Sequence, residues 1–312
     1  PDAESYISTE IQKLLPTATD KEFADFFTVL RGLSMYQDES GQRLLLKIIA
    51  DQSPLNKSTF KYDPKDVSTL KKVLNLVHLV APLLDSLKQN GPFFSFLTND
   101  VLPNIEELSD EMRIDVLRSV SVESASATPA DARQVIGTIY QKLIDQIPLK
   151  QGETEPALNF SYLECYLYCF HQLARKALGA LNPVCGIKIV TGQPGDDLRD
   201  YSAKRNDMIT RLQYLEQRCN TYRKTLIELL KKNRELAAKA ESASETTSTE
   251  ETAATAETAQ SSISNEEAQS TMRIIKNILK LSSALSKKQA TFLKPEEFYL
   301  SWVEYKGKKR SA

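Results

Sequence analysis

Residues 158–178 read LNFSYLECYLYCFHQLARKAL, and nearly every side chain from Phe160 to Phe170 is apolar or aromatic. A helix that is apolar almost all round is normally buried among other helices. Asn159 or Ser161 can cap its start, because both side chains accept hydrogen bonds from the first turn of a helix. The stretch therefore predicts the central helix of a helical domain.

A narrow polar stripe runs along this predicted helix. Glu164, His171 and Arg175 recur at helical spacing on one face, and Gln172 and Lys176 lie beside them. These polar residues interrupt the apolar run too often for a segment that spans a bilayer. The helix is therefore expected inside a protein core, with the stripe as its only polar face.

Length and composition limit the classes of protein to which the chain can belong. Its 312 residues, 41% of them hydrophobic, suffice for one or two domains with a sizeable core. The 10 glycines are few for a β-rich or dinucleotide-binding fold, and a net charge of -1 gives no overall attraction to nucleic acid or membranes. The 4 cysteines indicate free thiols in a reducing compartment. No signal peptide and no run of 18 apolar residues is evident.

Helix signals succeed one another through the first 150 residues. Thr19 with Glu22, Ser109, and Thr128 followed by Pro129 have the chemistry of helix starts. Apolar residues recur at helical spacing after each start, and no strand-type alternation competes with them. The expected helices cover 2–15, 19–33, 41–51, 63–87, 109–120 and 128–147, with loops at 53–62 and 121–127; Asp63-Pro64 begins the fourth and Pro82 kinks it.

Helices of this length, joined by short loops, are typical of stacked helical pairs of the HEAT or armadillo kind, with about 40 to 47 residues per repeat. The sequence shows no strict period, so a globular helical bundle is the alternative. The predicted fold class is all-α: a HEAT/armadillo-like superhelix of helical pairs that ends in a long C-terminal helical hairpin.

The hairpin is expected to begin with a long helix over 198–240. Its apolar side chains have heptad spacing, with Met208, Leu215, Tyr222, Leu229 and Leu236 on one line and Leu212 and Leu226 on the line three residues before. Arg205, Cys219 and Asn233 interrupt that second line. The seam can pack on its own chain, which we favour, or on a partner helix. Residues 226–230 also fit the helix-in-groove pattern LxxLL, although leucines at this spacing usually form a buried seam.

Two less regular segments flank this helix. Residues 179–197 are a predicted loop, in which 187–190 could be extended, and 241–270 have the composition of a disordered acidic linker. Helical spacing resumes at 271, and that helix is expected to return and pack on the long one. The predicted divisions are HEAT-like repeats at 1–150, an armadillo-like region at 151–240, the linker, and a returning helix with a basic tail at 271–312. Lys306, Lys308, Lys309 and Arg310 form a candidate nuclear signal, although a solvated tail has the same composition.

The sequence offers no convincing catalytic or metal site. No phosphate-binding loop or HExxH motif occurs, and His78 and His171 are the only histidines. Cys165 or Cys169 with His171 could form a nucleophile pair or part of a zinc site. However, Cys169 and His171 point to different faces of a helix, and a fourth zinc ligand is missing. We therefore expect buried structural thiols and a protein without enzymatic activity or cofactor.

Several short blocks resemble the apoptosis inhibitor 5 family, also called antiapoptosis clone 11. The blocks are Lys21–Phe23 with Val29–Leu33, Ser40–Arg43, Val101–Asn104, Leu158–Lys176, Cys185–Gly186 with Lys188–Pro194, and Leu300–Trp302 ahead of Gly307–Arg310. The block at Leu158–Lys176 is the most specific, and the one that ends at Pro194 resembles the plant-like form. The resemblance covers nearly the whole chain except the acidic linker.

This resemblance implies a nuclear, all-helical scaffold that regulates programmed cell death and lacks further N-terminal HEAT repeats. DEAD-box RNA helicases and Acinus-like factors are the partners that it implies, and the family's leucine-heptad region corresponds to 198–240. We expect a monomer with no membrane segment. The alternatives are an oligomer paired through the heptad helix, and an RNA-binding solenoid, which the near-neutral charge disfavours.

Overall fold

The computed structural model describes residues 2–56, 60–87, 92–149, 155–189, 192, 197, 199–244 and 264–303. Within these residues the regular structure is entirely helical and no strand occurs, which confirms the predicted all-α class. The candidate nuclear signal (Lys306, Lys308, Lys309 and Arg310) and residues 245–263 of the predicted linker lie outside the described residues.

The first four helices are α1 (Asp2–Leu14), α2 (Asp20–Gly32), α3 (Glu39–Asp51) and α4 (Val67–Leu87). Thr19 caps α2 as predicted, because its backbone N–H donates to Glu22 Oε2 at 2.8 Å and its hydroxyl oxygen accepts from the Glu22 N–H at 3.4 Å. This capping box satisfies backbone donors that the first turn leaves open. Asp38 caps α3 by accepting from the Gly41 N–H at 2.7 Å, so that helix begins before the predicted residue 41.

The predicted start of α4 at Asp63-Pro64 is too early. Asp63 closes a short turn instead, and Asp66 accepts a hydrogen bond from the Thr69 N–H at 3.0 Å. Both aspartates have cap chemistry, and the second lies directly before the amphipathic run, where its side chain satisfies the first turn of the helix. The helix then continues without interruption through Pro82.

One stretch of α4, Val67–Leu84, is apolar and long enough to cross a membrane by those two criteria alone. Lys71 and Lys72 interrupt the stretch, so it contains no unbroken run of 18 apolar residues. Its side chains at Val73, Val77 and Val80 are fully buried in the protein. We therefore interpret α4 as a core helix, which passes the same test of length and composition.

A compact group of turns and helices follows α4. It consists of α5 (Phe94–Phe96), a π-helical turn (Leu97–Val101), a 3-10 turn (Leu102–Glu107), α6 (Asp110–Ser124) and α7 (Pro129–Asp145). Ser109 and Thr128 cap α6 and α7, as predicted. The predicted loop over 121–127 is partly wrong, because α6 continues to Ser124. Its small serines let α6 approach the next layer closely, and the Ser121 hydroxyl donates to the Cys165 carbonyl at 3.2 Å.

The quoted stretch forms α8 (Phe160–Lys176), which packs against α6, α7 and α11 and is buried on all sides. Asn159 rather than Ser161 caps it, by accepting from the Tyr162 N–H at 3.1 Å. The predicted loop over 179–197 contains a short helix, α9 (Leu181–Cys185), while 187–189 form no strand. Gly186 ends α9 with φ +71°, a left-handed conformation that suits glycine at a helix C-terminus.

The predicted C-terminal hairpin is confirmed. It consists of α10 (Ser202–Ser244) and α11 (Asn265–Ser286), and α11 begins earlier than the expected residue 271, at a capping box formed by Ser264 and Glu267. Arg205 Nη2 donates to the carbonyls of Leu285 (2.7 Å) and Lys287 (2.8 Å), which places the start of α10 beside the end of α11. The two helices are therefore antiparallel.

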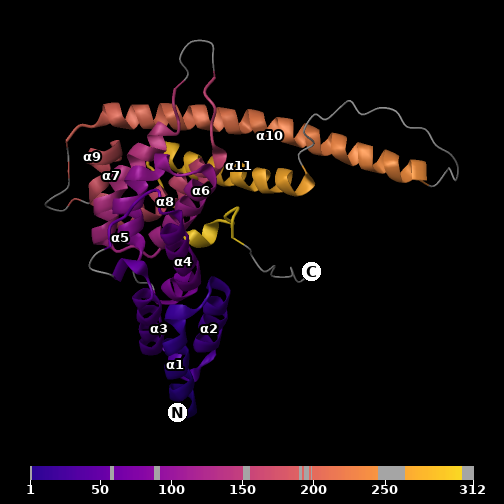
Figure 1. The fold of residues 1–312 in the computed structure, drawn as a ribbon. Helices are drawn as coiled ribbons and strands as arrows, with labels where there is room; N and C mark the ends of the chain where they lie inside the picture. Colours follow the sequence, from indigo (N-terminus) through magenta and orange to yellow (C-terminus); the bar gives the residue numbers. More distant parts are fainter. Residues whose placement is uncertain are drawn as a thin grey trace.

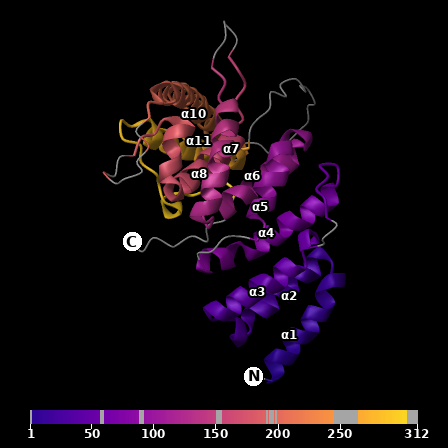
Figure 2. The ribbon, with the colours of Figure 1, turned by 90° about the vertical axis from the view of Figure 1, so that its left-hand side faces the viewer.

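The helices are stacked largely in chain order. Figure 2 shows α1–α3 at one end of the molecule, α4–α6 in the middle and α7, α8, α10 and α11 at the other end. Contacts run from α2 and α3 to α4, from α4 to α6, from α6 to α8, and from α8 to α11. This order agrees with the predicted superhelix of helical pairs, and the division into HEAT-like and armadillo-like parts stays a prediction.

Candidate protein-interaction surface

The inner part of α10 uses the predicted heptad seam within its own chain. Met208, Leu212, Leu215 and Leu226 are fully buried. Tyr222 is half-buried, and its ring stacks on Phe160 of α8 with centroids 5.3 Å apart. Cys219 and Arg205, which interrupt the heptad, fit this packing as well: Cys219 is buried, and Arg205 caps the last turn of α11. The inner part of the seam is therefore covered by other residues of the same chain.

The outer part of α10, residues 227–244, differs in this respect, because apolar side chains among its residues 227–235 are exposed. Figure 1 shows that α10 continues well beyond the N-terminal end of α11. Ile227 is 41% and Leu229 37% exposed, although Leu229 continues the heptad line of Leu215. Leu236 lies on the same line, and its side chain is outside the described residues. Within the LxxLL pattern, only Leu226 is buried.

A groove of about 1200 Å³ opens where the outer part of α10 leaves α11. It lies between three segments: α10, α11 and the C-terminal segment, which we define as residues 287–303. Its lining is Leu230, Gln269, Met272, Arg273, Lys276, Asn277, Lys280, Glu297, Tyr299, Ser301, Trp302 and Val303. The groove thus joins the uncovered half of α10 to the part of the chain that follows the predicted linker.

A buried carboxylate of α8 holds the walls of this groove in place. Glu164 Oε1 accepts from Asn277 Nδ2 at 2.6 Å, and its Oε2 accepts from the Ser301 hydroxyl at 2.6 Å. Asn277 also donates to the Tyr299 carbonyl at 2.9 Å. Burial raises the pKa of Glu164, whereas these hydrogen bonds act in the opposite direction. One side chain of α8 thereby fixes both α11 and the C-terminal segment.

His171 fastens the same two segments further along α8. Its Nδ1 accepts from the Leu293 N–H at 3.3 Å, so the proton is on Nε2, which lies 3.1 Å from the Leu281 carbonyl. Burial lowers the pKa of His171 to about 4, and the ring is therefore neutral at physiological pH. Gln172 adds a hydrogen bond to the Leu293 carbonyl at 3.4 Å. Glu164, His171 and Gln172 of the polar stripe thus form the docking site for α11 and the C-terminal segment, whereas Lys176 donates to the Ala125 carbonyl after α6 at 2.6 Å.

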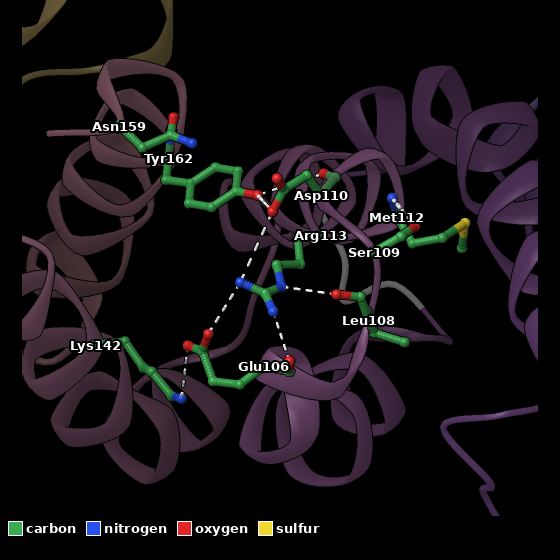
Figure 3. A network of polar contacts seen from close by, with 9 residues as sticks. All are labelled: Glu106, Leu108, Ser109, Asp110, Met112, Arg113, Lys142, Asn159 and Tyr162. Carbon is green, nitrogen blue, oxygen red and sulfur yellow. Dashed lines mark hydrogen bonds and ion pairs between the residues drawn. The ribbon is translucent and has the colours of Figure 1, made fainter. Parts of the chain in front are cut away.

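A second polar network joins α6 and the turn before it to α7 and α8 (Figure 3). Arg113 lies 3.1 Å from Glu106 Oε2, and Lys142 of α7 lies 3.6 Å from Glu106 Oε1. The Tyr162 hydroxyl of α8 donates to Asp110 Oδ1 at 3.2 Å. Glu106 is largely exposed, and ion pairs of this kind contribute little to stability. We interpret the network as an orienting contact between helices.

The cysteines and histidines form no reactive pair. Cys165 and Cys169 are buried, and burial raises the pKa of both thiols, that of Cys169 to about 12. Both ring nitrogens of His171 are engaged by α11 and the C-terminal segment, and His78 lies on α4. Among the described residues no group of three or more His, Cys, Asp and Glu could hold a metal ion. The groove is therefore the best candidate for a functional site.

Sequence reasoning missed the groove itself. Arg273, Lys276 and Lys280 recur at helical spacing on α11, and Trp302 follows shortly afterwards. This pattern of cations beside an aromatic residue was a usable signal. The surface that these cations face depends on how α11 packs on α10. That packing is a tertiary property, which the local sequence does not specify.

Comparisons with known proteins agree on one family. The family model described as apoptosis inhibitory protein 5 matches residues 1–312. The chain is 30% identical over 306 residues to the apoptosis inhibitor 5-like protein API5 of Oryza sativa subsp. japonica, which covers 96% of this chain and 53% of that protein. It is 29% identical over 190 residues to apoptosis inhibitor 5 of Homo sapiens, covering 56% of this chain and 36% of the relative. The chain thus spans about half the length, or less, of these relatives.

Proposed function

The chain belongs to the apoptosis inhibitory protein 5 family, and on this premise we propose that it is a helical adaptor that regulates programmed cell death through protein–protein contacts. The names of its relatives support the role in apoptosis. The uncovered outer part of α10, with the groove beside it, supports action through binding. We further propose that the protein has no enzymatic activity, since its buried thiols and the neutral His171 are used in packing.

The proposal rests mainly on the exposure of Ile227 and Leu229 in the outer part of α10. Exposed apolar side chains on a helix that extends beyond its own core are typical of a surface that a partner covers. Following the family resemblance, we propose DEAD-box RNA helicases and Acinus-like factors as partners, and the nucleus as the place of action. The basic run Lys306, Lys308, Lys309 and Arg310 would then serve for nuclear import.

A pull-down from nuclease-treated nuclear extract tests the adaptor. The bait is the full chain, compared with Ile227→Glu/Leu229→Glu in the outer part of α10. A matched control carries Val29→Glu/Leu44→Glu, two apolar residues of similar exposure on α2 and α3. Partners that the control retains and the α10 variant loses support the proposal. The absence of any specific partner, or equal loss with both variants, contradicts it.

The same exposed residues support a second candidate, an oligomer paired through the outer part of α10. A helix from a second copy could cover Leu229 and continue the heptad line. Light scattering at two protein concentrations distinguishes the two functions. A mass that rises with concentration, and returns to that of a monomer in Ile227→Glu/Leu229→Glu, favours the oligomer. A constant monomer mass excludes it.

A further inference from the structure

The groove between α10, α11 and the C-terminal segment combines a row of cations with an apolar floor. We propose that it binds an acidic amphipathic helix of a partner protein, with the partner's apolar face in the groove and its carboxylates toward α11. This inference deepens the proposed adaptor function and rests on it, because it states the chemistry of the partner segment.

The cations lie on one face of α11. Arg273, Lys276 and Lys280 are separated by three and four residues, which places them in one row along the helix. Lys280 is already engaged, since its Nζ donates to the Glu297 carbonyl at 2.7 Å and lies 5.0 Å from the centre of the Phe298 ring. Arg273 and Lys276 are exposed, and no carboxylate of the described residues lies within ion-pair distance of either. With respect to the described residues, these two cations are therefore available to a carboxylate of a partner protein.

The floor of the groove is apolar. Leu230 of α10 and Met272 of α11 line it from two sides, and Trp302 and Val303 line it from the C-terminal segment. All four side chains are only partly covered by the protein. Leucine or aromatic anchors of a helix would remove this apolar surface from water, which is the usual source of affinity in helix-in-groove recognition.

Charge complementarity decides which kind of partner fits. Among the described residues of the lining, Glu297 is the only carboxylate, against three cations. The adjoining outer part of α10 adds Lys231, Lys232 and Arg234 to these cations, against Glu228 and Glu235. A partner helix with glutamates beside its apolar face would meet opposite charge along the α11 wall, which favours association and fixes its orientation.

A protein segment fits this lining better than single-stranded RNA does. Proteins that bind single strands present successive aromatic rings on which bases stack. In the part of the lining that the structure describes, Tyr299 and Trp302 are the only aromatic residues, and the remaining apolar contacts come from the aliphatic and thioether groups of Leu230, Met272 and Val303. Preferential binding of RNA in the groove would therefore contradict the proposal.

The test measures fluorescence anisotropy of a labelled synthetic helix with the full chain. The probe is an amphipathic peptide of about 18 residues with leucines on one face and glutamates on the other. Two control peptides carry lysines in place of the glutamates, or serines in place of the leucines. We expect saturable binding of the acidic peptide alone, weakened by added salt because the contact is partly electrostatic.

Two protein variants locate the binding site. Arg273→Glu/Lys276→Glu should weaken binding of the acidic peptide about tenfold or more, since it replaces attraction by repulsion. Lys47→Glu/Lys71→Glu makes the same change of charge at exposed lysines of α3 and α4 and should alter binding less than about twofold. Circular dichroism of both variants checks that they fold.

The inference is overturned if no peptide binds, if both variants lose binding equally, or if a labelled oligouridine binds in the groove more tightly than the peptide does. The pull-down separates this failure from failure of the adaptor function. Nuclear partners that Arg273→Glu/Lys276→Glu still recovers would remove the groove and leave the adaptor. Peptide binding without any nuclear partner would keep the groove and contradict the adaptor.

Discussion

The inner and outer parts of α10 have the same heptad pattern and opposite surroundings. Leu215 is fully buried, whereas Leu229, two heptads further along the same line, is 37% exposed. The antiparallel partner explains the difference. α10 has 43 residues and α11 has 22, or about 65 Å against about 33 Å of helix. Arg205 lies beside the C-terminal end of α11, so the N-terminal end of α11 lies near Leu226. Burial of the heptad line ends there.

A heptad pattern thus predicts an apolar seam on a helix but not which element covers it. The inner part has found its partner within the chain, so its leucines contribute to stability. In the outer part Leu229 continues the pattern and is exposed, so it is available for binding. If this is correct, equal substitutions in the two parts must have unequal effects.

The largest effect is expected from Leu215→Ala in the inner part. The substitution leaves a cavity in the core and should lower the free energy of unfolding by about 2–5 kcal/mol. Urea denaturation followed by circular dichroism measures it. A loss below about 0.5 kcal/mol would mean that the inner seam is not packed, and the contrast with the outer part would disappear.

Asn277→Ala weakens the attachment of α11, on which the inner part packs. The substitution removes two hydrogen bonds, to Glu164 and to the Tyr299 carbonyl, and leaves the buried carboxylate with fewer donors. We expect a loss of about 1–3 kcal/mol in the same assay. Asn206→Ala, at an exposed position of α10, is the matched control and should change stability by less than about 0.5 kcal/mol. Equal effects would contradict the anchoring role of Glu164.

Acid should loosen the same attachment through His171. Its pKa is lowered by burial to about 4, below the value of about 6.5 in an unfolded chain. The unfolded state therefore binds more protons between these values, and the contribution of His171 to stability is lost as the pH falls from about 6.5 to about 4. The expected slope is up to about 1.4 kcal/mol per pH unit.

Glu123 has the opposite sign and must be separated from this effect. Burial in α6 raises its pKa to about 8, so its contribution falls as the pH rises from about 4.5 to about 8. The test is therefore a difference: the stability of the native chain minus that of His171→Gln, measured by urea denaturation from pH 4.5 to pH 8. This difference should grow with pH up to about 6.5 and then remain constant. A difference that does not change with pH would exclude His171 as the titrating group.

The smallest effect is expected from Leu229→Ala in the outer part. The side chain packs on little of its own chain, so stability should change by less than about 0.5 kcal/mol. Thermal unfolding monitored beside Leu215→Ala gives the direct contrast. A loss of 2 kcal/mol or more, roughly that of a buried leucine, would show that the outer part is covered after all.

Local signals in the sequence predicted the helices well. Thr19, Ser109 and Thr128 cap helices as expected, because a cap depends on residues three positions apart. The error at Asp63 has a local cause, since Asp66 offers the same chemistry three residues later. Residues 121–124 were taken for a loop because small residues favour loops, whereas here they allow α6 to approach α8.

Long-range partners were the part that could not be predicted. The stripe at Glu164 and His171 was recognised, but its partners Asn277 and Leu293 lie more than a hundred residues away along the chain. Likewise, the heptad did not reveal that α11 is too short to cover the outer part of α10. Both depend on how the returning helix is placed, which no local pattern specifies.

The C-terminal residues 264–303 are held on the rest of the protein by docking, with Glu164 and His171 as fixed points. Joined by the chain, the two parts meet at a high effective concentration. Cutting the chain between residues 244 and 264 would turn this contact into the assembly of two fragments with a dissociation constant of its own. Folding would then depend on the amounts of both fragments by mass action, and the smaller one, supplied separately, could rebuild the groove.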